Sequence, residues 1–144
     1  MEYTTMDFIK LNNKIYRNTQ MYLDKVLKKY QISSGAYPYL FILAKNEGIS
    51  QNQISREMGQ DKAMSARTIT KLIELEYVYK QGDNRDSRAY RLYLTEKAKE
   101  TIPKIHKEIE GLIDLITEGI LEEEKNIAIK ALSRIFDNTQ RFKE

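Results

Sequence analysis

Hydrophobic residues recur every three or four positions over long stretches of the chain and alternate with polar residues over one short stretch. The helical spacing predicts amphipathic helices over residues 7–30 and from residue 95 onward. The alternation covers "YVYKQ" and "AYRLYL", on either side of "GDN", and predicts two antiparallel strands joined by a tight turn. The expected fold class is mainly α with a small β-hairpin, in the α+β group.

A short apolar helix is predicted after the first long one. Its sequence, "YPYLFILAKN", has almost no polar face, which is typical of a buried central helix. We expect Ser33 or Ser34 to cap it and Pro38 to lie in its first turn, where a missing N–H has no cost. Gly48 is expected to end it.

Two further short helices follow, separated by a glycine. Ser50 and Gln53 have the capping-box spacing at the start of the first, which should stop at Gly59. Asp61 is expected to cap the second, "KAMSARTITKLIELE". Two short helices joined in this way form a helix-turn-helix, and a hairpin directly after the second helix makes it a winged helix.

The segment after the hairpin is expected to be helical to the end of the chain. Thr95 should cap a long helix that Pro103 kinks, and Gly119 marks a break. Glu122 to Glu124 would start the last helix at the positive end of its dipole.

The helix after Gly59 has one face suited to the core and one suited to DNA. Ser65, Ile69, Leu72 and Ile73 define the inward face, although serine is a weak core residue. The other face would offer small, basic and hydroxyl-bearing side chains to a major groove, where Arg reads guanine and Ala or Met meets a thymine methyl. Its residues are Lys62, Ala63, Arg67, Thr70 and Lys71, with Met64 and Thr68 at the flanks. The alternative is an ordinary solvated helix face.

The hairpin tip carries two acids and two arginines. A hairpin beside a groove-bound helix reaches the adjacent minor groove, whose negative potential attracts an inserted arginine such as Arg85. Asp83 would hold that guanidinium in a planar pair, while Asp86 and Arg88 brace the tip or meet a phosphate. The alternative is a surface salt-bridge cluster that contributes little.

These segments together resemble the MarR family of bacterial transcription regulators. The resemblance rests on "GQDKAMSARTITKL", on the tip "DNRDSR", which matches the family's D-x-R-[DE]-x-R pattern in full, and on Leu94–Thr95 at a helix start. It covers essentially the whole chain, residues 1–144, as a single domain. It implies a winged helix-turn-helix over 33–98 and a helical dimerisation region over 1–32 and 99–144.

Three positions depart from the family pattern. Glu76 and Ala98 stand where glycine is frequent, which bears on geometry more than on function. Met64 replaces a frequent Ser or Thr near the start of the recognition helix, which bears on sequence preference.

The resemblance implies a homodimer that binds double-stranded DNA, as a repressor rather than an activator. Two recognition helices would occupy successive major grooves about 34 Å apart and read a pseudo-palindrome. A protein-interaction module that uses the same exposed helix without DNA is the alternative, and RNA binding is a weaker one.

Apolar stripes near both ends of the chain suit the dimer interface that the family implies. For each residue, packing within its own domain is the alternative. The stripes comprise Phe8, Ile15 and Tyr22 at one end and Ile127, Leu132, Ile135 and Phe136 at the other.

Composition excludes several classes of protein. The 144 residues suit one domain, the net charge is +3, and no apolar run is long enough to cross a membrane. The absence of cysteine fits a cytoplasmic protein without disulfides or thiolate metal sites. With His106 alone, expected on an exposed helix side, and no glycine-rich phosphate loop, we expect no enzyme, metal or cofactor.

Ten tyrosines remain to be explained. Tyr16, Tyr37 and Tyr39, with Tyr22, could line a cavity for a small aromatic or phenolic effector between the end helices and the wing domain. They could equally belong to the core.

Overall fold

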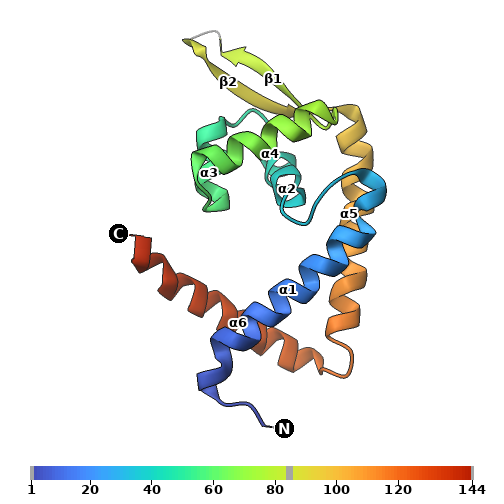
Figure 1. Ribbon diagram of the computed structural model, residues 1–144, viewed down its shortest axis with the longest axis vertical. Helices are drawn as coiled ribbons and strands as arrows, with labels where there is room; N and C mark the ends of the chain where they lie inside the picture. The colour runs from blue at the N-terminus through green and yellow to red at the C-terminus, as the bar shows by residue number, and fades with distance from the viewer. Residues whose placement is uncertain (1, 84–85, 144) are drawn as a thin grey trace. The chain divides into compact units, whose positions relative to one another are not determined.

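The computed structural model describes the backbone of residues 2–83 and 86–143 and the side chains of residues 2–82 and 90–143. The protein is mainly helical with one antiparallel hairpin, which confirms the predicted fold class (Figure 1). It forms two compact units, residues 1–110 and 111–144. In chain order the elements are α1 (Phe8–Val26), α2 (Tyr37–Lys45), α3 (Gln51–Met58), α4 (Lys62–Glu74), β1 (Val78–Asp83), β2 (Asp86–Leu94), α5 (Glu96–Ile116) and α6 (Glu122–Thr139), with 3₁₀ turns at Thr5–Asp7, Lys28–Tyr30 and Gln140–Lys143.

The first unit begins with α1, which is shorter than the expected helix over residues 7–30. It ends at Val26, and a 3₁₀ turn leads to Gln31, whose φ of 61° lies in the left-handed region. A non-glycine residue in that conformation reverses the chain and cannot continue a helix. The chain then turns toward α2.

The helix covers nearly the whole predicted segment "YPYLFILAKN", but the capping residues expected at its two ends were wrong. Ala36 occupies the cap position without a side-chain hydrogen bond, and the N–H of Ser34 donates instead to Asp24 of α1 (2.7 Å). At the other end α2 stops at Lys45, and Gly48 lies beyond it in the loop to α3. Pro38 lies in the first turn, as predicted.

The core of the first unit is built around α2, which is buried as its apolar sequence predicted. Leu40 and Leu43 of α2 have no exposed surface. The helix packs against α3 and β2. Large side chains from the surrounding elements that are also fully buried include Leu27, Ile54, Ile69, Leu72, Leu92 and Ile105.

The hairpin follows α4 directly and makes the unit a winged helix-turn-helix. Val78 pairs with Leu94 and Gly82 with Tyr90, and the register shifts between Gly82 and Asp83. Val78, Leu92 and Leu94 face the core from one side of the hairpin. Figure 1 shows the rest of the hairpin extending away from α4.

The start of α5 is tied to the end of α4. Thr95 caps α5 as predicted, because its hydroxyl accepts the N–H of Ala98 (3.1 Å). The same hydroxyl donates to the carbonyl of Glu76 (2.6 Å), a residue held at a φ of 63°. Glu76 therefore adopts the left-handed conformation for which the family frequently has glycine. Further along, Pro103 lies inside α5.

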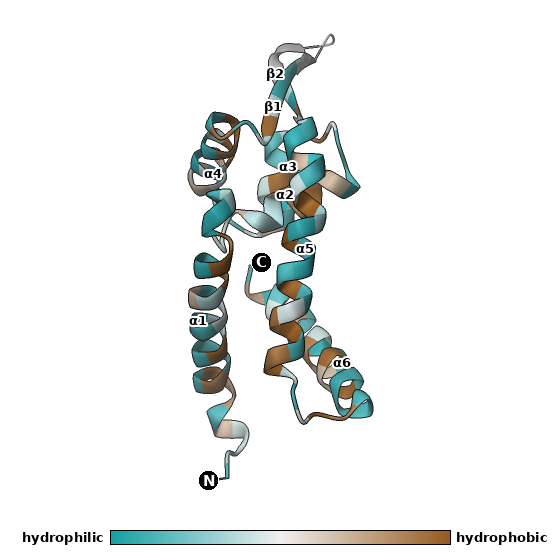
Figure 2. Ribbon diagram, turned by 90° about the vertical axis from the view of Figure 1, so that its right-hand side faces the viewer, coloured by the Kyte–Doolittle hydropathy of each residue, from teal (hydrophilic) through white to brown (hydrophobic). Residues whose placement is uncertain are grey.

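The second unit contains the end of α5, a turn at Gly119 (φ 81°) and α6. Glu122 to Glu124 occupy the first turn of α6, as predicted. No residue of α6 is buried. In the ribbon of Figure 2, brown bands mark hydrophobic residues along α6 and, separately, along α1.

Candidate nucleic-acid interface

Local hydrogen bonds fix the start of α3 and the turn between α3 and α4. Ser50 and Gln53 form the predicted capping box, with distances of 3.2 and 2.9 Å. Gly59 ends α3 at a φ of 65°, and Asp61 caps α4 by accepting the N–H of Met64 (2.7 Å). The Ser55 hydroxyl also donates to the carbonyl of Gln60 across the turn (2.9 Å). The orientation of α4 is therefore set at its N-terminal end.

The inward face of α4 is the predicted one. Ile69 and Leu72 are buried, and Ile73 is partly buried. Ser65 is completely buried because its hydroxyl pairs with that of Tyr39 (3.1 Å), which satisfies both polar groups. The Ser65 hydroxyl therefore links α4 to Tyr39 of α2.

The outward face of α4 presents the residues proposed to contact DNA. Thr68 is partly buried and its hydroxyl donates to the carbonyl of Met64 (3.0 Å), whereas Arg67 lies with Nη2 3.9 Å from the sulfur of Met64. The sequence has no acid between residues 62 and 71. Exposed on this face are Lys62, Ala63, Met64, Arg67, Thr70 and Lys71.

For three of the four proposed wing residues, the structure describes the backbone alone. Asp83 is the last residue of β1, Asp86 the first of β2, and Arg88 lies within β2, all three as backbone positions. Arg85 lies outside the described residues. Its proposed insertion into a minor groove stays a prediction, as do the roles of the other three.

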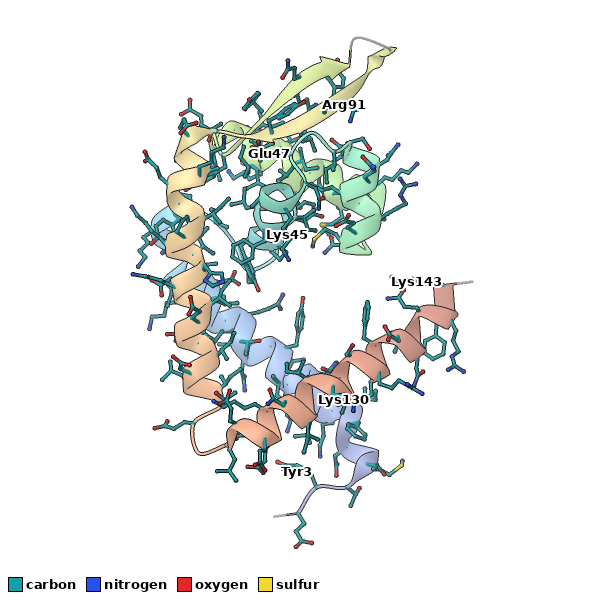
Figure 3. All side chains as sticks on the ribbon, turned by 180° about the vertical axis from the view of Figure 1, so that it is seen from behind. Tyr3, Lys45, Glu47, Arg91, Lys130 and Lys143 are labelled. Carbon is teal, nitrogen blue, oxygen red and sulfur yellow. The ribbon has the colours of Figure 1, made fainter. Side chains whose placement is uncertain are left out.

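The base of the wing is held by residues that the sequence did not single out. Arg91 donates to the carbonyl of Gly48 (2.8 Å), and the carboxylate of Glu47 accepts the N–H of Leu94 (2.9 Å). Backbone bonds between Gly48 and Leu92 and between Leu92 and Ile49 add to these contacts. Figure 3 labels Glu47 and Arg91 on the two segments concerned. No local sequence pattern marks this pairing, because its partners are more than 40 residues apart.

The described part of the wing also carries exposed aromatic rings. Tyr79 and Tyr93 stack at 5.5 Å, and Lys80 lies 5.2 Å from the ring centre of Tyr90. Tyr93 approaches Gly48, whose φ of 89° and close packing favour glycine. These contacts connect the two strands in the described part of the hairpin.

The three tyrosines proposed for a ligand wall have different environments. Tyr16 is exposed and its hydroxyl accepts a hydrogen bond from Gln20 (2.6 Å). Tyr37 is half-buried, packs edge-to-face on Phe41 at 5.4 Å, and burial raises the pKa of its phenol. Tyr39 is completely buried, which matches the alternative that it belongs to the core.

Two neighbouring cavities lie between α2 and α5, and they share Ala44 and Ile102. One is about 340 Å³ and also includes Glu47, Leu94, Lys99 and Pro103. The other is about 200 Å³ and also includes Phe41, Lys45 and His106. We call these two cavities the α2–α5 groove. Tyr16, Tyr37 and Tyr39 do not line it, although Tyr37 contacts its wall residue Phe41.

His106 lies on an exposed side of α5, as predicted, and its Nδ1 is 2.7 Å from the carboxylate of Glu110. Among the described side chains, those of residues 2–82 and 90–143, no three His, Cys, Asp or Glu gather in a way that would hold a metal ion. Across the same described residues, no helix is both long and apolar enough to cross a membrane.

Comparisons with known proteins agree with this geometry. A model of the MarR family matches residues 30–89. The HTH-type transcriptional regulator BilQ of Clostridioides difficile (strain CD3) is 35% identical over 73% of this chain and 70% of its own length. An uncharacterized HTH-type transcriptional regulator of Bacillus subtilis (strain 168), YybA, is 29% identical over 79% of this chain and 76% of its own.

Solved structures share the fold over nearly the whole chain. A MarR transcriptional regulator from Methanosarcina mazei Go1 superposes with a TM-score of 0.87 at 32% identity, covering 94% of this chain and 99% of that one. A putative MarR family regulator from Listeria monocytogenes, complexed with 26mer DNA, superposes with a TM-score of 0.84 at 22% identity, over 96% and 90% of the two chains. At that identity the second likeness concerns the fold alone.

Proposed function

The chain belongs to the MarR family of transcriptional regulators, and we propose that it acts as a homodimeric repressor on a pseudo-palindromic operator in double-stranded DNA. Members of this family regulate transcription and are not enzymes, so the chain is a regulator rather than an enzyme. We place its action in the cytoplasm, where an operator is accessible.

The observation that carries DNA binding is the outward face of α4. Lys62, Arg67 and Lys71 are exposed there, without an acid among the intervening residues. Lys and Arg neutralise phosphates and release counterions, which supplies sequence-independent affinity, while Arg67 has the donor fork for guanine. The cap at Asp61 fixes the N-terminal end of this helix. The Listeria monocytogenes protein, which has the same fold, was solved in a complex with 26mer DNA.

Exposed apolar side chains support dimerisation. Phe8 and Ile15 of α1 are 56% exposed, and Leu132 and Phe136 of α6 are 55% and 60% exposed. Leaving large apolar side chains in water is unfavourable by roughly 1.5–3 kcal/mol each relative to burial. We propose that the same helices of a second copy cover them, which gives two α4 helices for two half-sites.

A small organic effector is the third part of the proposal. The α2–α5 groove has apolar walls from Phe41, Ala44 and Ile102, with Lys45 and Lys99 at its edges. These cations suit the carboxylate or phenolate of a small aromatic molecule. Outside the groove itself, the exposed Tyr16 and the half-buried Tyr37 have surface available to an aromatic ring, whereas the buried Tyr39 does not.

A gel-shift titration tests DNA binding most directly. The probe is the duplex upstream of the gene that encodes the chain, with unlabelled random duplex DNA or duplex RNA as competitor. We expect a shifted band with two chains per site that neither competitor removes at equal concentration. Equal competition by random DNA would contradict operator recognition. Preferential competition by RNA would favour RNA binding, and no shift with any nucleic acid would favour a protein-interaction module.

A further inference from the structure

Met64 and Arg67 lie one helical turn apart on the outward face of α4 and contact each other. We propose that they act as one reading unit that selects a thymine directly beside a guanine in each half-site, with Met64 also positioning Arg67. The inference rests on the proposed operator binding of α4 and adds the bases that this chain prefers.

The backbone around Met64 leaves only its side chain available for recognition. The N–H of Met64 donates to Asp61 (2.7 Å), and its carbonyl accepts from the Thr68 hydroxyl (3.0 Å). The neighbouring residue Ser65 takes the core position instead. The Met64 side chain is 42% exposed, and its backbone is fixed by these hydrogen bonds near the start of the helix. Recognition helices contact bases with residues at this end.

The contact with Arg67 orders a side chain that would otherwise sample many rotamers. Nη2 of Arg67 lies 3.9 Å from the sulfur of Met64, so the thioether is a soft acceptor for one N–H. The remaining guanidinium donors keep the planar fork that matches O6 and N7 of guanine. Lysine at position 67 would lose this bidentate geometry.

The spacing fits two adjacent base pairs. Residues three apart rise about 4.5 Å along a helix, close to the rise of about 3.4 Å between base pairs. With the fork of Arg67 on guanine, the apolar part of Met64 lies beside the next base. A thymine methyl is the group that a thioether side chain prefers there, since cytosine presents a polar amine without a methyl.

The first experiment is selection from a random duplex library by the full-length protein, followed by affinity measurement on the selected duplex. We expect each selected half-site to contain a thymine adjacent to a guanine. Replacing that thymine by uracil removes only the methyl and should weaken wild-type binding about fourfold, the equivalent of one buried methylene. If the selection yields no preferred sequence, both the proposed operator recognition and this inference are contradicted. A preferred sequence lacking adjacent thymine and guanine would overturn only the inference.

Two substitutions of Met64 separate its two roles. Met64→Gln keeps the length of the side chain but should lose the thymine preference and respond equally to thymine and uracil. Met64→Leu keeps apolar contact, so we expect the thymine preference to persist while discrimination for guanine falls severalfold because the sulfur is gone. Met21→Gln, at an exposed methionine of α1, is the matched control and should select the wild-type sequence. Unchanged thymine and guanine preferences in both Met64 variants would overturn the proposal.

Discussion

The sharpest contrast between single residues is between Arg85 and His106. If the Arg85 side chain enters a minor groove, Arg85→Ala should weaken operator binding by about 1–3 kcal/mol without affecting folding. His106→Gln should leave DNA binding and thermal stability nearly unchanged, because the His106 side chain is largely exposed and its contacts are with the exposed Glu110 and, at 6.1 Å, with the ring of Phe41. Gel shift and thermal melting measure both. Equal losses in the two variants would mean that the DNA-binding surface has been misplaced.

Glu76 offers a residue-level test of stability rather than binding. Its φ of 63° is unfavourable for a residue with a side chain, and the side chain itself is exposed. Glu76→Gly should raise the free energy of unfolding by about 1 kcal/mol, since relief of the left-handed strain exceeds the entropy lost by glycine. Glu74→Gly, two residues earlier in helical conformation, is the matched control and should lower it by about 1 kcal/mol. Denaturant unfolding measures the free energy of unfolding of both variants. A lower value for Glu76→Gly than for the wild type would show that Glu76 is not strained.

Elements with local signals were predicted well from the sequence, and those with distant partners were not. The caps at Ser50, Asp61 and Thr95 act within three residues, so their spacing alone identified them. The cap expected at Ser33 or Ser34 failed because Asp24, ten residues away, binds the loop before α2. Likewise nothing near Arg91 in the sequence indicates its bond to Gly48.

The candidate site shows the same division. The outward face of α4 followed from helical periodicity, and the structure exposes those residues except Thr68, which is partly buried. The hydroxyl of the buried Tyr39 pairs with Ser65, 26 residues later, so periodicity in α2 alone could not distinguish a core tyrosine from one that lines a ligand cavity.

The wing base allows a prediction about how elements are joined. Glu47 accepts the partly buried N–H of Leu94, and removing a charged acceptor leaves that donor without its partner. Glu47→Ala should therefore lower the free energy of unfolding by about 1–2 kcal/mol and speed hydrogen exchange at the Leu94 amide. Glu57→Ala on the exposed side of α3 is the control and should have little effect. Unchanged exchange at Leu94 would show that Glu47 does not hold the wing.

At the scale of the whole molecule, dimerisation should depend on apolar residues of the terminal helices. Phe136→Lys places a charge on an exposed apolar position of α6 and should halve the mass measured by light scattering. Asp137→Lys, at the adjacent exposed position, should leave the dimer intact. Removal of residues 1–20 takes away most of α1. The shortened protein should be either monomeric or insoluble. A dimer that survives both the Phe136 substitution and this deletion would rule out the proposed interface.

Regulation by a small molecule would act through the same dimer. Operator half-sites have a fixed spacing. If a ligand moves the two α4 helices apart, the affinity of the protein dimer for the operator therefore falls, even when the movement is small. The α2–α5 groove is suited to this effect, since its wall residue Glu47 also holds β2 of the wing. We expect a thermal-shift screen of aromatic acids and phenols to identify a stabilising compound that also releases the operator in a gel shift. Ala44→Met should fill the groove and abolish both responses while preserving DNA binding. Release by peroxide or a divalent metal, with no response to any organic compound, would contradict this mechanism.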